Sequence, residues 1–276
     1  MSSATPGKRT VANMADARTH VKERTSAPEG FFETEAAGLR WLGEATASGG
    51  ADVVEVLDVD SRSLTLAHVE SASPNAEAAH AFGKALAATH AAGAPGFGAL
   101  PPGAGHYYFG PLDQPISLPT DVYDDFGTFY SRARLHPLAE RVDLPGRETR
   151  LLDDLCRALE NGAAEFGRSA VTPARVHGDL WSGNVMWSPN GVVLIDPAAC
   201  GHHPLADLAM LMMFGAPHVE EIVAGYEAAR PLRSGWRQEI PLHQLFGYLV
   251  HLDLFGGAYL SPTNDALRAS AELCGV

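Results

Sequence analysis

The sequence contains little cysteine, and its cysteines stand far apart. Of its 276 residues only three are cysteine: Cys156, Cys200 and Cys274. Their number is odd, and no two of them have the CxxC spacing typical of zinc and redox sites. We therefore expect neither a disulfide framework nor a cysteine-based zinc site.

Long apolar runs and basic clusters are also missing. A membrane-spanning helix needs about 18 consecutive apolar residues, and the sequence has no such stretch. The first 20 residues also lack the apolar core of a signal peptide. Lysine and arginine number 20 against 33 aspartates and glutamates, a formal net charge of −13. A phosphate backbone or an anionic membrane would repel such a chain. We expect a cytoplasmic protein without nucleic-acid or membrane partners.

The sequence does contain enough apolar material for two lobes. With 46% hydrophobic residues, a chain of this length can bury a sizeable core and is long enough for about two domains. The first 70 residues combine short β-type patterns with one helical pattern. The candidate strands are 19–24, 53–59 and 64–69, and the candidate helix is 33–47.

Beyond residue 70 the patterns are mainly helical. Asn75 is a suitable N-cap for an alanine-rich helix, and the Gly- and Pro-rich segment 93–105 is expected to be a loop. The helical patterns cover 75–90, 122–135, 148–166, 205–214, 218–229, 242–259 and 265–273, with one β-rich segment at 175–195. We predict an α+β fold with a small antiparallel, β-rich lobe at 1–70 and a larger helical lobe at 71–276.

The segment 176–197, VHGDLWSGNVMWSPNGVVLIDP, carries the most chemical information. In it His177-Gly178-Asp179 is followed, five positions after the aspartate, by Asn184. The SPNG that follows is typical of a tight turn between two strands, and the second strand ends at Asp196. Such a hairpin would return Asp196 to the neighbourhood of Asp179 and Asn184.

These residue types at this spacing suit phosphoryl transfer. In kinases a carboxylate lies beside the attacking hydroxyl, an asparagine follows five residues later, and a later aspartate binds magnesium. Asp179 is therefore the candidate catalytic residue. Asn184 and Asp196 are candidate Mg²⁺ ligands, because Mg²⁺ prefers oxygen donors. The structural alternative is that Asp179 caps a turn and Asp196 ends a strand, and the joint spacing argues against it.

The same segment resembles a known family. HGDLWSGN, an apolar strand ending in Ile-Asp-Pro, and then GHHPLADLAM are similar to the fructosamine (ketosamine) 3-kinase family. FGPLDQP at 109–115 and DDFGTFYSRARLHP at 124–137 extend the resemblance upstream. That family belongs to the aminoglycoside phosphotransferase and choline kinase-like group of the protein-kinase-like fold. The resemblance therefore implies two lobes with a nucleotide site between them.

The resemblance also implies nucleotide-binding residues. Lys22 resembles the strand lysine that contacts the α- and β-phosphates of ATP. Glu35 resembles its ion-pair partner, and Glu33 is the competing candidate. Residues 66–70 resemble the hinge between the lobes. The hinge residues expected to contact adenine through their backbone are Ala67, His68 and Val69.

Four other side chains have a structural and a functional interpretation. Asp207, in the Asp-Leu-Ala of the resemblance, is expected to support the catalytic loop, and it also suits the first turn of a helix. His202 and His203 are adjacent, and adjacent histidines do not easily share one metal, so no zinc site is expected there. Trp181 is expected in the core, although its place beside Asp179 could put it at the border of a sugar site.

The N-terminus departs from the family pattern. Kinases of this type cover the phosphates with a glycine-containing hairpin before the lysine strand. Only 21 residues precede Lys22, and Gly7 is the one glycine among them. Either the hairpin is short, with Gly7-Lys8 at its tip, or the lobe lacks its first strand. The second case leaves a non-catalytic pseudokinase open as an alternative.

The motif and the resemblance together imply a phosphotransferase that uses ATP and Mg²⁺ and has an alcohol group as acceptor. The implied acceptor is the C3 hydroxyl of a ketosamine, either a small molecule or a glycated amine, and the implied role is deglycation. Rival acceptors in the same class are an aminoglycoside, choline and homoserine. The Leu-Trp-Ser-Gly-Asn and Phe-Tyr elements favour the ketosamine.

Overall fold

The computed structural model describes residues 19–163 and 171–276, so the expected hairpin around Gly7 lies outside the described residues. The described chain opens with an antiparallel sheet of three strands in the order β1-β4-β3. Their bounds are β1 Thr19–Glu23, β3 Val56–Val59 and β4 Ser63–Ala67. Lys22 lies on β1, opposite Leu64 of β4.

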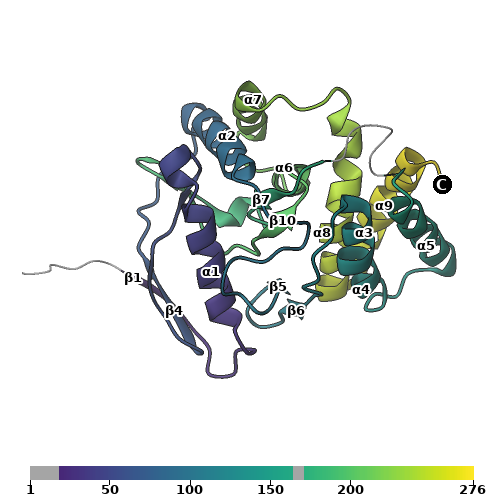
Figure 1. Cartoon of the computed structure of the whole chain (residues 1–276), viewed down its shortest axis with the longest axis horizontal. Helices are drawn as coiled ribbons and strands as arrows, with labels where there is room; N and C mark the ends of the chain where they lie inside the picture. The colour runs from purple at the N-terminus through teal and green to yellow at the C-terminus, as the bar shows by residue number, and fades with distance from the viewer. Residues whose placement is uncertain (1–18, 164–170) are drawn as a thin grey trace, which may run out of the picture.

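Helix α1 (Phe31–Gly43) lies alongside this sheet (Figure 1). Residues of β4 alternate between buried and partly exposed, as expected of a half-buried strand. Its buried side chains Leu64 and Leu66 pack with Phe32 and Leu39 of the helix. This contact fixes α1 next to the strand that carries Lys22.

A short parallel pairing connects the two predicted lobes. β2 (Asp52–Val53) pairs with β9 (Gly191–Leu194), which forms an antiparallel hairpin with β8 (Val185–Ser188). The predicted SPNG turn joins these two strands, with Ser188 opposite Gly191. The N-terminal segment therefore adds a strand to the sheet that carries the catalytic hairpin.

Helices make up most of the chain after residue 70. Helices α3, α4, α5, α8 and α9 gather at the end of the molecule far from β1, whereas α2, α6 and α7 lie nearer the N-terminal sheet (Figure 1). The helix bounds are α2 Ala76–Ala91, α3 Phe126–Tyr130, α4 His136–Ala139, α5 Gly146–Glu160, α6 Leu205–Met213, α7 Val219–Ala229, α8 Ile240–Phe255 and α9 Leu260–Cys274. The remaining strands are β5 Tyr108–Phe109, β6 Ile116–Ser117, β7 Ala174–Val176 and β10 Cys200–His202.

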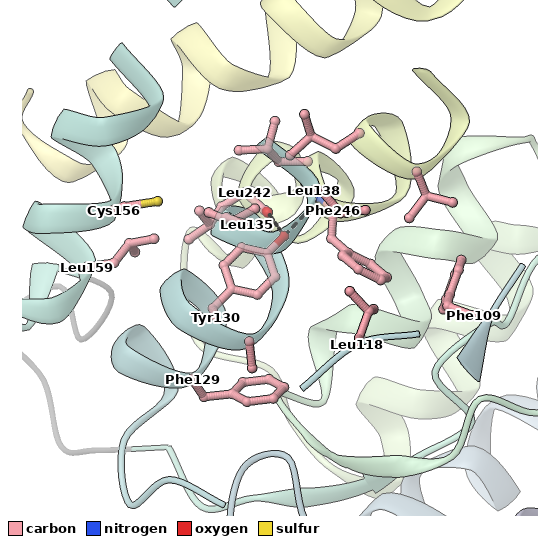
Figure 2. Packing of buried hydrophobic residues seen from close by; sticks show 14 of the residues in the cluster. Phe109, Leu118, Phe129, Tyr130, Leu135, Leu138, Cys156, Leu159, Leu242 and Phe246 are labelled. Carbon is pink, nitrogen blue, oxygen red and sulfur yellow. Dashed lines mark hydrogen bonds between the residues drawn. The ribbon is translucent and has the colours of Figure 1, made fainter. Parts of the chain in front are cut away.

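The largest apolar cluster lies among α3, α5 and α8, and Tyr130 lies near its centre (Figure 2). The Tyr130 hydroxyl donates a hydrogen bond of 2.6 Å to the carbonyl of Leu242 and accepts one of 3.1 Å from the backbone N–H of Phe246. A tyrosine hydroxyl that is buried with its ring usually finds a hydrogen-bond partner. These two bonds meet that condition and connect α3 to the first turns of α8.

The α+β, kinase-like layout expected from the sequence is confirmed, and several element ends differ. The helix expected at 122–135 begins at Phe126, because the Asp125 side chain caps it by accepting a hydrogen bond from the N–H of Thr128. The helix expected at 242–259 ends at Phe255. The short strands β5, β6 and β10 were not expected. No helix in the described ranges is both long and apolar enough to cross a membrane.

Candidate active site

The catalytic loop lies between β7 and β8, and the β8–β9 hairpin returns the chain to it. The Asn184 side chain closes this arrangement. Its Nδ2 donates to the carbonyl of Asp179 at 2.7 Å, and it lies 3.3 Å from both a carboxylate oxygen of Asp179 and the carbonyl of Asp196. The structure thus brings together the three residues that the sequence singled out.

The orientation of the Asn184 amide follows from these contacts. Three acceptors surround one end of the side chain, so that end must be the NH₂ group. The amide oxygen therefore points elsewhere and is available as a ligand. Asp196 has one carboxylate oxygen engaged by Lys22. Two oxygen donors in this pair match the ligand preference of Mg²⁺.

Asp207 supports the catalytic loop from behind. It is fully buried, and its carboxylate accepts hydrogen bonds from the backbone N–H groups of His177 at 2.8 Å and Gly178 at 2.9 Å. The same carboxylate lies 3.0 Å from Nε2 of His90. Burial alone would raise the pKa of Asp207, but the bonds from His90 and the loop hold it below its ordinary value.

Two neighbouring residues fix the loop backbone. His177 is buried and donates from Nε2 to the carbonyl of Ile195 at 2.8 Å, while its Nδ1 accepts from the N–H of Asp179. Because Nδ1 accepts from a backbone N–H, the ring is in its neutral form and connects the loop to Ile195; burial also lowers the pKa of His177. Gly178 has φ of 85°, and a Cβ there would lie 2.0 Å from the carbonyl oxygen of Ala198. Only glycine fits at this position.

The Asp179 carboxylate is in a different electrostatic state. Burial raises its pKa to about 7. The hydrogen bond from Asn184 opposes this rise, and the charges of Asp196 and Asp207 add to it. The residue is partly buried and lines the cavity, so its carboxylate lies among protein atoms at the cavity wall. A carboxylate with a pKa near neutrality is suited to take a proton.

Lys22 connects the N-terminal sheet to this loop. Its Nζ lies 2.6 Å from a carboxylate oxygen of Glu35 and 2.6 Å from one of Asp196. Although burial lowers the pKa of Lys22, the two carboxylates outweigh it and raise the pKa. Burial also leaves the pKa of Glu35 raised despite the opposing charge of Lys22. Glu33, the competing candidate, is exposed in the first turn of α1.

The Asp196 backbone is strained. Its φ is 55°, in the left-handed region that residues other than glycine seldom adopt. Strain of this kind costs about 1–3 kcal/mol and persists where surrounding structure enforces it, often at functional sites. The strained residue is the one whose carboxylate contacts Lys22 and whose carbonyl lies beside Asn184.

These residues share one cavity of about 720 Å³. Its lining includes Asp179, Asn184, Asp196, Lys22 and Glu35. The three expected hinge residues are not among the residues that line this cavity in the described part of the chain. They follow the end of β4, and their expected contacts with adenine stay a prediction; they are Ala67, His68 and Val69.

Sequence reasoning missed much of the cavity wall. Tyr108 and Phe109 come from the unexpected strand β5, and Phe214, Phe255 and Tyr259 come from the ends of helices. Simple periodicity assigns such apolar residues to the core. Trp181 also lines the cavity and is 42% exposed, so the expectation that it lies in the core was wrong. Its position at the border of a sugar site stays a prediction.

A second polar cluster lies away from the cavity. Ligand atoms of His203, Glu239 and His243, all buried, lie within 4.8 Å of one another. Two contacts argue against a metal there. The Leu205 N–H donates to Nδ1 of His203 at 3.1 Å, so the neutral ring carries its proton on Nε2 and has no free lone pair. Arg233 already pairs with Glu239. We interpret the cluster as a polar part of the core.

The fold and the site together define a phosphotransferase of the kinase-like fold. The choline kinase LicA from Streptococcus pneumoniae shares the fold, with a TM-score of 0.57 at 15% identity over 94% of this chain and 87% of that one. A profile of the fructosamine kinase family matches residues 8–272. The chain belongs to that family, and membership implies ATP as the phosphoryl donor.

Individual relatives agree with this assignment. A "Probable ketoamine kinase" from Enterococcus faecium is 30% identical over 90% of this chain and 86% of its own length. The mouse ketosamine-3-kinase is 32% identical over 51% of this chain and 45% of its own. The crystal structure of a "putative fructosamine-3-kinase" from Thermobifida fusca superposes with a TM-score of 0.82 at 39% identity, covering 92% of this chain and 85% of that one.

Proposed function

We propose that this protein transfers the γ-phosphoryl group of ATP to the C3 hydroxyl of a ketosamine. The observation that carries the proposal is the position of Asp179. Its carboxylate has a pKa of about 7 and lies in one cavity with Asn184, Asp196 and the Lys22–Glu35 pair. The family membership supports the ketosamine as acceptor, and the name of the mouse relative supports the C3 position.

In this reaction Asp179 orients the acceptor and takes its proton. The ketose oxygen forms a bond to the γ-phosphorus as the bond from that phosphorus to the β-γ bridging oxygen breaks, and ADP leaves. The hydroxyl proton passes to the Asp179 carboxylate. Phosphoryl transfer depends mainly on positioning and electrostatic stabilisation, so the bonds that hold the loop contribute to the rate by fixing this carboxylate.

Lys22 and the oxygen donors are placed for the phosphates. Lys22 Nζ, held by Glu35, would contact the α- and β-phosphates. The free amide oxygen of Asn184 and the carboxylate of Asp196 would hold Mg²⁺, which when bound neutralises charge on the β- and γ-phosphates. Because Lys22 also pairs with Asp196, we expect ATP to take over part of the contact that this carboxylate now makes with the lysine.

The proposed C3 position connects the reaction to deglycation. Enolisation between C1 and C2 of the ketosamine would place a C3 phosphate where it can leave, and hydrolysis of the remaining imine would free the amine. The product of phosphorylation would therefore release the unmodified amine without a second active site.

The test is a product analysis. The protein is incubated with Mg·ATP and ribulosyl- or fructosyl-Nε-lysine, and ADP, the phosphorylated sugar and free lysine are followed, the sugar by ³¹P and ¹³C NMR. We expect one ADP per ketosamine, phosphate at C3 and a delayed release of lysine. An aminoglycoside, choline and homoserine are run in parallel. Turnover of one of these without turnover of any ketosamine would contradict the proposal.

A further inference from the structure

Four aromatic side chains line the part of the cavity formed by the C-terminal helices. Phe214 follows α6, His251 and Phe255 lie in the last turns of α8, and Tyr259 ends the 3₁₀ turn η6 (Gly256–Tyr259). The ring of His251 is central. The centroids of Phe214, Tyr259 and Phe255 lie 4.9, 5.0 and 5.4 Å from its own. We call these four residues the aromatic cluster.

Core packing does not fully explain this cluster. Phe255 is 59% exposed and Phe214 is 37% exposed, so a large part of these two side chains stays outside the core. They nevertheless border the same cavity as Asp179. Aromatic side chains that line a cavity and remain open to it are typical of ligand sites.

The backbone is shaped to bring these rings together. In a straight helix His251 and Tyr259 would be about 12 Å apart along the axis, at about 1.5 Å per residue. Instead α8 ends at Phe255, and the next residue, Gly256, has φ of 74° and ψ of −154°, a region essentially restricted to glycine. The chain then turns and places the Tyr259 ring 5.0 Å from His251.

The electrostatics of the cavity favour a cation at the cluster. Nδ1–H of His251 donates to the carbonyl of Gly247 at 2.8 Å, which leaves Nε2 as an acceptor. Burial lowers the pKa of His251, which favours the neutral ring. Among the described residues that line the cavity, Lys22 is the one basic side chain besides His251, and it stands against the carboxyl groups of Glu35, Asp179 and Asp196. Aromatic faces attract cations such as ammonium groups.

We propose that the aromatic cluster binds the substituted ammonium of the ketosamine, so that these four residues form a subsite for its amine substituent. The inference rests on the proposed function, because Asp179 places the sugar in the same cavity. The ammonium lies against the ring of Phe255, the most exposed of the four, and its alkyl chain leaves toward solvent. The cluster thus selects among ketosamines by their amine.

The first test compares acceptors and ring variants. Three acceptors share one ketose: the Nε-lysine derivative, the unsubstituted 1-amino sugar, and an ether in which oxygen replaces the amine nitrogen of the lysine derivative. We expect Phe255→Ala to raise KM for the lysine derivative about three- to tenfold, in line with an exposed to partly desolvated cation–π contact. KM for ATP and for the other two acceptors should change little.

Matched variants separate the causes. Phe255→Leu keeps apolar surface and removes the ring face, so it should resemble Phe255→Ala, whereas Phe255→Tyr should restore the wild-type KM. Val122→Ala, at a valine 58% exposed elsewhere, should change nothing. If the lysine derivative is turned over and Phe255→Ala leaves its KM unchanged, the subsite proposal is wrong and the proposed function stands.

A binding measurement keeps the two proposals distinct. If the wild type turns over no ketosamine, calorimetry with Nε-methyl-lysine amide, which has no sugar, still tests the cluster. Weaker binding to Phe255→Ala than to the wild type would support the subsite while the proposed function fails. Equal binding, or none by either protein, would overturn the subsite.

A second variant tests the backbone without touching a ring. Gly256→Ala should force the turn open, separate Tyr259 from His251, and raise KM for the lysine derivative to a similar extent. Gly257→Ala is the control, because a Cβ at Gly257 would meet nothing within 4 Å and its φ is not positive. Equal KM values for the two glycine variants would contradict the role assigned to the turn.

Discussion

Asp179 and Asp207 lie on opposite sides of one loop, and their carboxylates are held in opposite ways. Asp207 is fully buried and is held by two backbone N–H groups and a histidine. Asp179 receives one long contact from Asn184 at its carboxylate and faces the cavity. The pKa is lowered at Asp207 and raised at Asp179. The back of the loop is therefore built for stability, and its front retains a carboxylate that ionises with difficulty.

The largest expected effect is the loss of the carboxylate at the back. Asp207→Ala leaves the N–H groups of His177 and Gly178 unpaired in the interior, and we expect a loss of about 3–5 kcal/mol in the free energy of unfolding. Urea unfolding measures it. Glu220→Ala removes a first-turn acid from an exposed helix position and should cost under about 1 kcal/mol. Similar losses in the two variants would mean that Asp207 only stabilises the start of its helix through the helix dipole and does not support the catalytic loop.

A smaller loss is expected at the glycine between the two aspartates. In Gly178→Ala the new Cβ meets both the left-handed backbone conformation and the Ala198 carbonyl, so we expect a loss of about 3 kcal/mol by the same unfolding assay. Gly103→Ala is the matched control, because its φ of 86° is nearly the same and a Cβ there meets nothing within 4 Å. The difference in the free energy of unfolding between the two variants measures the cost of the overlap with the Ala198 carbonyl. Equal losses would show that this overlap contributes nothing.

At the front of the loop, substitution of the carboxylate should stabilise the folded protein instead of destabilising it. Asp179→Asn should stabilise the ligand-free protein by about 2 kcal/mol at pH 8. The rise in pKa from 3.8 to about 7, at about 1.4 kcal/mol per unit, sets an upper limit of about 4.5 kcal/mol. Because the pKa of Asp179 is raised on folding, the folded state holds a proton that the unfolded state releases in this pH range. The deficit of the wild type therefore grows as pH rises from about 4 to about 7 and then levels off. Parallel stability curves for wild type and variant would contradict this.

The smallest effect concerns the pair that links the front of the loop to the N-terminal sheet. Glu35→Gln removes one of the two carboxylates that hold Lys22, and we expect KM for ATP to rise about tenfold, or about 1.4 kcal/mol. Glu33→Gln, at the exposed neighbour, should leave KM for ATP unchanged. Steady-state kinetics at saturating ketosamine distinguish the two glutamates. A raised KM for ATP in Glu33→Gln but not in Glu35→Gln would make Glu33 the functional partner of Lys22.

The front of the loop was predictable because its chemistry is contained in a short segment. Asp179, Asn184 and Asp196 lie within 18 residues, and the turn between them has a recognisable sequence. The position of Asp207 was visible, but its pairing with His90 joins residues more than 100 positions apart. A single sequence carries no signal for such a contact.

The rest of the site depends on local chain geometry that periodicity does not reveal. The helix expected at 242–259 is broken by Gly256, and that break creates the contact between Tyr259 and His251. Likewise, strand β2 of only two residues pairs with β9 across the expected boundary at residue 70. Two-residue strands have too few positions to show an alternating pattern, so their pairing appears only in three dimensions.

The central claim is that Asp179 takes the acceptor proton, and one measurement tests it most directly. The turnover number of Asp179→Asn is compared with those of the wild type and Asp124→Asn, an exposed carboxylate control, with ATP binding followed by calorimetry. We predict that Asp179→Asn loses about 10²- to 10⁴-fold in kcat and still binds Mg·ATP, while Asp124→Asn matches the wild type. A kcat for Asp179→Asn within a few fold of the wild type would contradict the account.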